Sequence, residues 1–149
     1  MRPSGKILFT IVRSAAIAAA VMLSSQVSAY AELVINIDKS SQRMTVERNG
    51  ATQHVFAVST GRRPYGTPNG TFRPQRLERK WFSRKYYNSP MPYSIFFYGG
   101  YAIHGTNAIR QLGGPASHGC IRLAPGNAAT LFAMVRREGM ANTRIVIAN

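Results

Sequence analysis

The sequence predicts a mainly β protein that carries one helix near its C-terminal end. Short apolar runs rich in β-branched residues recur between residues 33 and 104, and Gly, Pro and Asn mark turns between them. Only the segment that begins at Pro125 places apolar residues at helical spacing. The chain shows no repeat and no low-complexity segment, so we expect one domain after its first 31 residues.

The N-terminal part of this domain is expected to contain a strand followed by a hairpin. Residues 33–37 (LVINI) form the first apolar run, and a polar turn follows at residues 38–41. Residues 44–47 and 54–59 (HVFAVS) flank the Asn-Gly dipeptide at 49–50, which favours two-residue hairpin turns. We therefore predict that these two segments pair.

The middle of the chain is harder to assign. Residues 67–70 (TPNG) predict a turn, but residues 74–92 keep no period and mix aromatic side chains with cations. We interpret this segment as a long loop, or flap, because loops of such length in compact domains are usually functional. Residues 94–98 and 101–104 then predict a second hairpin that turns at Gly99-Gly100.

The helix is expected directly after the segment that holds Cys120. Pro125 suits its first turn, and Gly139 can cap its C-terminal end. The residues that form one apolar stripe are Ala128, Leu131, Phe132 and Val135. Residues 143–148 predict a closing strand.

Residues 1–31 have the pattern of a secretory signal peptide. Three basic residues precede an apolar run at 14–23, and Ala29-Tyr30-Ala31 supplies a cleavage pattern before Glu32. An uncleaved anchor is the alternative, but this run of about 10 residues is short against the roughly 20 that a membrane span needs. We therefore predict an exported, periplasmic domain at residues 32–149, without stable membrane insertion after cleavage.

The charge of the chain indicates anionic surroundings. The full sequence carries a net charge of +14, and the part after residue 31 keeps 16 basic against 5 acidic residues. Such an excess favours a polyanionic partner, or merely keeps the surface solvated. No nucleic-acid motif appears, and the cations are scattered apart from a denser stretch at residues 73–85. We therefore expect the anionic cell wall as the partner, and no nucleic acid.

The strongest indication of chemistry is the single cysteine, Cys120, within residues 117–123 (SHGCIRL). His104 lies 16 residues upstream, and a lone thiol outside the cytosol has no intrachain partner. An imidazole can take the proton of a thiol and so produce a strong nucleophile. Gly119 permits an unusual turn whose backbone amides can bind an oxyanion. Together these features indicate acyl transfer through a thioester.

Each of these residues also has a structural interpretation. Cys120 can be a small buried hydrophobe, and His104 can pack at the end of a strand. His118 can be a base, a pocket former or a structural donor, while Arg122 can lie on the surface, hold a loop or bind a carboxylate. His54, on a plain strand without polar neighbours, is interpreted as structural.

Other kinds of site fit the sequence less well. The spacing of His104, His118 and Cys120 matches no common zinc pattern, and no nearby carboxylate offers a base, so no metal is expected. A papain-like protease would place its cysteine before its histidine. A sortase-like transpeptidase shares the order His, Cys, Arg but lacks the glycine before its cysteine.

The motifs closely resemble those of the L,D-transpeptidases of the YkuD type. The resemblance covers residues 33–148, with Arg122 at a place where many members have Asn and others have Arg. The matching segments are residues 59–61 (STG), 67–72 (TPNGTF), 91–93 (MPY), 104–106 (HGT) and 117–123.

The resemblance implies a β-sandwich of mixed sheets with one short helix, acting on peptidoglycan stem peptides without any cofactor. A thiolate would attack the third stem residue, usually diaminopimelate, release D-alanine and form a thioester. A second diaminopimelate would then form a 3→3 crosslink, or a lysine would anchor an outer-membrane protein. Hydrolysis by the same site, as an L,D-carboxypeptidase or endopeptidase, and a non-catalytic wall-binding domain are the alternatives.

The resemblance also implies roles for individual residues. Cys120 would be the nucleophile and His104 the general base and acid, with the Gly105 carbonyl orienting the imidazole. Backbone amides around His118, Gly119 and Cys120 would form the oxyanion hole. The residues that would shape the pocket are Ser117, His118 and Arg122.

The flap adds candidates for binding the substrate. If its basic stretch at residues 73–85 lines the approach to Cys120, the cations there and three nearby tyrosines can hold the carboxylates of the stem peptide and the sugar chain. These candidates are Arg84, Tyr86, Tyr87 and Tyr93.

Overall fold

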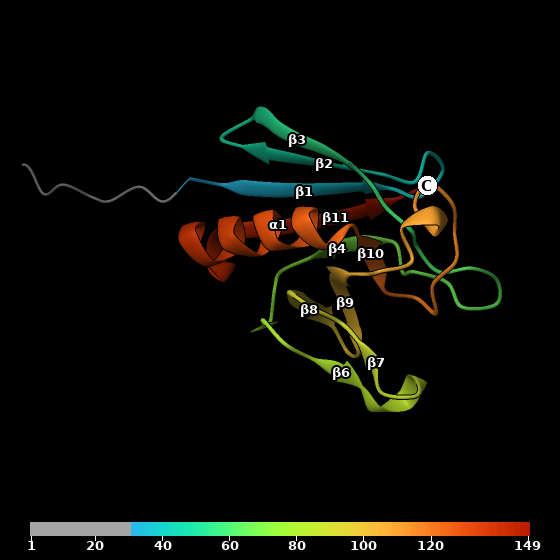
Figure 1. Cartoon of the computed structure of the whole chain (residues 1–149). Coiled ribbons are helices and arrows are strands. Elements are labelled where there is room, and N and C mark those ends of the chain that lie inside the picture. Colours follow the sequence, from blue (N-terminus) through green and yellow to red (C-terminus); the bar gives the residue numbers. More distant parts are fainter. Residues whose placement is uncertain (1–30) are drawn as a thin grey trace, which may run out of the picture.

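The computed structural model describes residues 31–149, and the predicted signal peptide lies outside the described residues except for Ala31. The first sheet has the strand order β3-β2-β1-β11-β4 (Figure 1). Strands β1 and β11 run parallel, and the other neighbours in this sheet are antiparallel. Its strands are β1 (Leu33–Asp38), β2 (Arg43–Arg48), β3 (Ala51–Ala57), β4 (Gly70–Phe72) and β11 (Thr143–Ala148).

The second sheet has the order β10-β9-β8-β5. Strands β9 and β10 run parallel, whereas β8 is antiparallel to both of its neighbours. Its strands are β5 (Arg76–Glu78), β8 (Ser94–Tyr98), β9 (Tyr101–Gly105) and β10 (Ile121–Leu123). Each sheet thus mixes parallel and antiparallel pairs, as predicted.

Both predicted hairpins are present. Strands β2 and β3 join through Asn49 (φ 50°) and Gly50 (φ 78°), whose positive φ angles suit a two-residue hairpin turn. Strands β8 and β9 join at Gly99-Gly100. The expected closing strand is β11, which pairs with β1 in the middle of the first sheet.

The prediction of a loop over residues 74–92 was wrong for part of this segment. Strand β5 pairs with β8 at the edge of the second sheet, and β6 (Phe82–Ser83) pairs with β7 (Ser89–Pro90) in a small hairpin. Figure 1 shows this β6–β7 hairpin projecting from the rest of the domain. Three-residue pairings between distant segments leave no periodic signal in the sequence, which is why β5 escaped prediction.

The helix α1 (Pro125–Glu138) packs on both sheets, with contacts to β1, β8 and β9. All four predicted stripe residues are buried, and one core joins the helix to both sheets. A fully buried aliphatic or aromatic side chain stabilises a fold by about 1.5–3 kcal/mol. The largest fully buried side chains include Phe97, Leu33, Ile35, Ile37, Met44, Ile95, Leu131 and Ile145. Within the described residues, no helix combines the length and the apolar character needed to cross a membrane.

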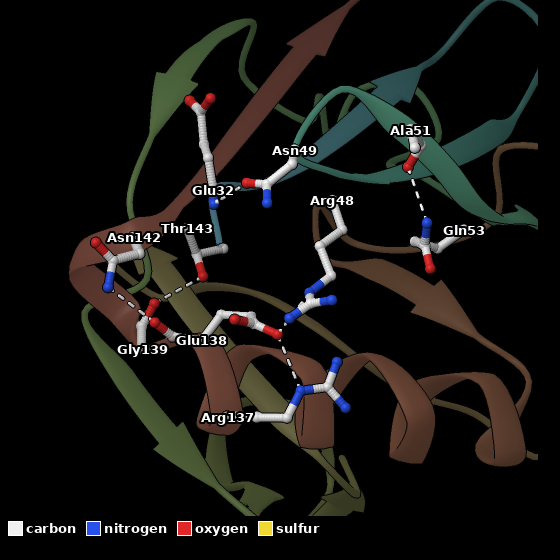
Figure 2. A network of polar contacts seen from close by, with 10 residues as sticks. All are labelled: Glu32, Arg48, Asn49, Ala51, Gln53, Arg137, Glu138, Gly139, Asn142 and Thr143. Carbon is white, nitrogen blue, oxygen red and sulfur yellow. Dashed lines mark hydrogen bonds and ion pairs between the residues drawn. The ribbon is translucent and has the colours of Figure 1, made fainter. Parts of the chain in front are cut away.

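A polar network anchors the C-terminal end of α1 (Figure 2). The buried carboxylate of Glu138 accepts hydrogen bonds of 2.9 Å from Nε of both Arg48 and Arg137. These two guanidinium groups hold the pKa of Glu138 below its usual range, so the carboxylate is charged at neutral pH. Asn142 donates a 2.8 Å hydrogen bond to the Glu138 carbonyl. The network thus connects α1 to β2 and to the segment that leads into β11.

Candidate active site

Parallel pairing of β9 and β10 brings the predicted nucleophile and base to one face of the second sheet. Residue Arg122 is level with His104, and Ile121 is level with Ile103. Ile103 and Ile121 are fully buried in the core, and side chains alternate along a strand. His104, Arg122 and Cys120, which lies two residues before Arg122, therefore share the opposite face. The helix α1 follows the segment that holds Cys120, as expected, and β10 is formed by the last three residues of that segment.

His104 is held as a neutral base. Its Nδ1 lies 2.8 Å from the carbonyl oxygen of Gly105, which can only accept a hydrogen bond. Nδ1 therefore carries the proton, and Nε2 keeps a lone pair that can take a proton from a nucleophile. Burial lowers the pKa of His104 to about 4, so the imidazole is uncharged at neutral pH. The predicted contact between His104 and the Gly105 carbonyl is present.

Gly105 itself is enclosed, which fixes the end of β9. Its N–H donates a 2.8 Å hydrogen bond to the carbonyl of Pro92. A Cβ atom at this position would lie 3.1 Å from Pro92 and 3.3 Å from both Ala128 and Pro125 of α1. The close approach of α1 thus holds the carbonyl that orients His104.

Cys120 is half-buried and rests as a thiol. Its Sγ lies 3.9 Å from the carbonyl oxygen of Gly100, and it packs against Met91, Phe96 and Ala102. Burial raises the pKa of the Cys120 thiol, while a backbone interaction with Ala102 and the charge of Arg122 act in the opposite direction. The resting site therefore combines a thiol with a neutral imidazole.

The turn before Cys120 is held by its own side chains. Ser117 Oγ accepts a 3.0 Å hydrogen bond from the Gly119 N–H and donates one of 2.5 Å to the Cys120 carbonyl. Gly119 has φ +119°, and a Cβ atom there would lie 2.6 Å from the ring of Tyr101. The Gly119 amide binds Ser117 in the resting site, so it is not free to bind an oxyanion in this arrangement. The amides of His118 and Cys120 remain as candidates.

Sequence reasoning missed the segment that supports this turn. The backbone of Ser59 exchanges hydrogen bonds of 3.0 and 2.9 Å with Arg122, and Ser117 N–H donates to the Thr60 carbonyl at 3.0 Å. Thr67 Oγ1 donates a 2.7 Å hydrogen bond to the Gly119 carbonyl. The matching motifs at residues 59–61 and 67–72 were the available signal, but spacing alone does not show that they contact the cysteine turn.

His118 is surrounded by aromatic and cationic groups. Its ring stacks on Tyr86 with centroids 4.5 Å apart, and Tyr65 meets it edge-on at 4.7 Å. Nη2 of Arg62 lies 3.1 Å from His118 Nε2, and a guanidinium can only donate. Burial, then Arg62 and other nearby cations, lowers the pKa of His118. Because the acceptor nitrogen of His118 is engaged, the geometry favours a pocket-forming role over that of a base.

The other predicted site residues lie at varying places around the cysteine motif. Arg122 is half-buried, and its Nη1 donates a 3.2 Å hydrogen bond to Gln111. Tyr87 is fully exposed, and Arg84 is exposed on the β6–β7 hairpin. Tyr93 packs against Phe132 of α1 with ring centroids 5.7 Å apart. Of the three candidate tyrosines, Tyr86 is the one whose ring contacts the cysteine motif, by stacking on His118.

Two alternative interpretations can be compared with this geometry. His54 stacks on Phe56 of β3 with centroids 5.1 Å apart, in keeping with a structural residue. Among residues 31–149, no three His, Cys, Asp or Glu side chains gather in a way that could hold a metal ion.

The family profile of the YkuD type, the L,D-transpeptidase catalytic domain, matches residues 32–147. The chain belongs to this family. L,D-transpeptidases are acyltransferases, and both the predicted resemblance and the predicted fold class are confirmed. A search among curated proteins found no match.

Solved structures of L,D-transpeptidases share the fold. One from Mycobacterium smegmatis has 23% identity and a TM-score of 0.72, and the match covers 80% of this chain and 59% of that one. One from Mycobacterium tuberculosis H37Rv has 23% identity and a TM-score of 0.73, with 80% and 58% covered. One from Stackebrandtia nassauensis has 24% identity and a TM-score of 0.70, with 81% and 57% covered. The chain thus spans less than two thirds of the length of these L,D-transpeptidases.

The resting state of this YkuD-type site predicts how its thiol reacts. We expect iodoacetamide to alkylate Cys120 slowly at neutral pH, because burial raises the thiol pKa and reduces the thiolate fraction. The rate should rise through the alkaline range when followed by intact mass from about pH 5 to about pH 11. A rate plateau that extends from neutral pH down into the acid range would instead reveal a preformed thiolate–imidazolium pair and contradict this assignment.

Proposed function

We propose that this chain transfers an acyl group from a peptidoglycan tetrapeptide stem through a thioester on Cys120. The observation that carries the proposal is the neutral, buried His104, with Nδ1 bound to Gly105 and Nε2 left to accept a proton. It shares one sheet face with Cys120, the only cysteine of the chain. A neutral base oriented on the same face of the sheet as a thiol is an arrangement that nucleophilic catalysis can use.

The first half-reaction would consume the donor stem. His104 Nε2 accepts the thiol proton as Cys120 Sγ attacks the carbonyl carbon of diaminopimelate, and an oxyanion forms that the amides of His118 and Cys120 can bind. Collapse of this intermediate breaks the C–N bond to D-alanine. The imidazolium returns its proton to the leaving amine, so the thioester forms with His104 neutral again.

The second half-reaction would release the acyl group. An acceptor amine gives a proton to His104 Nε2 and attacks the thioester carbon, and the sulfur leaves and regains the proton as a thiol. With diaminopimelate as the amine the product is a 3→3 crosslink, and with a protein lysine it is an anchored outer-membrane protein. Water in place of the amine gives hydrolysis by the same residues.

The proposed setting is the periplasm and its cell wall. The signal-peptide pattern of residues 1–31 and the excess of 16 basic over 5 acidic residues after it support this setting. Stem peptides carry free carboxylates, so they complement a basic domain.

Product analysis tests the proposed function. The chain is incubated with disaccharide-tetrapeptide, and the products are identified by mass spectrometry. We expect release of D-alanine and a 3→3 dimer, while the disaccharide-tripeptide, which lacks D-alanine, serves as a matched control that cannot be a donor. Tripeptide without dimer would replace transpeptidation by hydrolysis, and unchanged tetrapeptide would contradict both.

A further inference from the structure

Three cations gather around His118 beside the candidate active site. Arg62 contacts the His118 ring directly, at 3.1 Å, and also donates a 2.9 Å hydrogen bond to the Ala116 carbonyl. Lys85 Nζ lies 5.4 Å from the ring centroid of Tyr86, which stacks on His118. Arg122 lies on the sheet face that carries Cys120. We call Arg62, Lys85 and Arg122 the cation cluster.

The cation cluster has no carboxylate to balance it. Each ion pair among the described residues involves other arginines, and none involves a member of the cluster. Arg62 uses two of its five N–H donors in the contacts above, and the guanidinium of Arg122 makes one hydrogen bond, to Gln111. Donors therefore remain for an anionic ligand.

The members of the cluster act on one another and on the thiol. Burial, and to a smaller extent the charge of Arg62, lowers the pKa of Arg122. Burial, and then Arg62, Arg122 and Lys85, lowers the pKa of His118. Burial raises the pKa of the Cys120 thiol, and the charge of Arg122 partly opposes that rise. Like charges held together without a counterion destabilise one another, and a bound anion would relieve this repulsion.

We propose that the cation cluster, with Arg62 at its centre, binds a carboxylate of the donor stem peptide and so determines which donors reach Cys120. Arg62 presents the planar fork of donors that suits a carboxylate, while His118 and the ring of Tyr65, whose centroid lies 5.4 Å from the Arg62 guanidinium, position it. The inference rests on the proposed function, because it assigns part of the donor's binding site. Two carboxylates belong to the residues on either side of the bond that breaks: that of the terminal D-alanine and that on the distal centre of diaminopimelate.

Binding measurements on Cys120→Ala test the cluster without turnover. Calorimetry compares the tetrapeptide stem with two analogues, one amidated at D-alanine and one amidated at diaminopimelate. We expect Arg62→Gln to weaken binding of the free acid about tenfold and amidation of the bound carboxylate to weaken it by a similar factor. Arg62→Gln should then have little further effect on the affinity for the peptide whose bound carboxylate has been amidated. The amide that loses affinity identifies which carboxylate is bound.

Matched variants separate binding from structure. Lys85→Gln, on the exposed hairpin, should weaken binding less than Arg62→Gln, and Arg62→Lys should retain part of the affinity because it keeps the charge without the fork. Arg136→Gln, on the exposed side of α1, also removes one positive charge but lies outside the cation cluster. It should leave the affinity for the peptide unchanged. In the background with Cys120, iodoacetamide should still alkylate Arg62→Gln at the rate of the parent.

The outcomes distinguish this inference from the proposed function. If Arg62→Gln weakens the free acid and both amides equally, Arg62 only supports the turn and the inference is wrong. The inference would also be wrong if the Cys120→Ala chain bound all three peptides with equal affinity and Lys85→Gln did not change that affinity. The affinities can follow the expected pattern while the chain that retains Cys120 releases no D-alanine. In that case the proposed function is wrong, but the assignment of a carboxylate site is supported.

Discussion

Replacing Cys120 with alanine should abolish release of D-alanine from disaccharide-tetrapeptide, with a loss of at least about 10³-fold. The chain has no second cysteine that could substitute, and no thioester can form without Sγ. Release of D-alanine is measured by mass spectrometry at saturating donor. His104→Gln should cause a loss of similar order, because it removes the group that would take the thiol proton.

The control for this experiment is His54→Gln. His54 stacks on Phe56 of β3, away from the cysteine motif, so the variant should retain the activity of the parent. Cys120→Ala should unfold at the same urea concentration as the parent within error, since Cys120 is only half-buried. If Cys120→Ala gave the products of the parent, the thioester mechanism would have to be abandoned.

Replacing Gly61 with alanine should destabilise the domain by about 2–4 kcal/mol and reduce activity with it. A Cβ atom at Gly61 would lie 1.9 Å from the carbonyl oxygen of Tyr65 and 3.0 Å from the amide nitrogen of Thr67. Both are backbone atoms, so no side-chain rotation can relieve the overlap. The Gly61 N–H also donates a 2.8 Å hydrogen bond to Thr67 Oγ1, which supports the Gly119 carbonyl. The loop must move, and the cysteine turn loses that support.

Gly66→Ala is a matched control in the same loop. A Cβ atom at Gly66 would have no atom within 4 Å, so its stability in urea should stay close to that of the parent. The urea midpoint and the D-alanine release rate are measured for both variants. Equal midpoints for Gly61→Ala and Gly66→Ala would show that the loop accommodates the overlap and that the close approach has no structural role.

Local patterns were sufficient to predict much of the fold. The Asn-Gly dipeptide placed one hairpin correctly, since Asn49 and Gly50 both take the positive φ angles that such turns require. The apolar stripe placed α1, because helical spacing brings its members to one buried face. Strands β5 and β10 were missed, because three residues carry no periodicity and their partners lie elsewhere in the chain.

The sequence likewise predicted some features of the candidate site and missed others. The residue types and order of His104 and Cys120 sufficed to predict a thiol–imidazole pair, and the contact of His104 with the Gly105 carbonyl is as predicted. The hydrogen bond of the Gly119 amide to Ser117 Oγ was not predicted, because spacing along the chain does not show it. Arg62 was not recognised, since its contact with His118 joins residues 56 positions apart.

The sequence by itself determined the chemistry available to this L,D-transpeptidase family member, since one cysteine and a histidine within its motifs limit the reactions that the chain can perform. Only the tertiary structure decided which ring nitrogens of His104 and His118 are engaged, which amides remain for an oxyanion and which cations lie near His118. The physical reason is that hydrogen-bond partners and burial set protonation and charge. Both depend on contacts between segments that are distant in the chain.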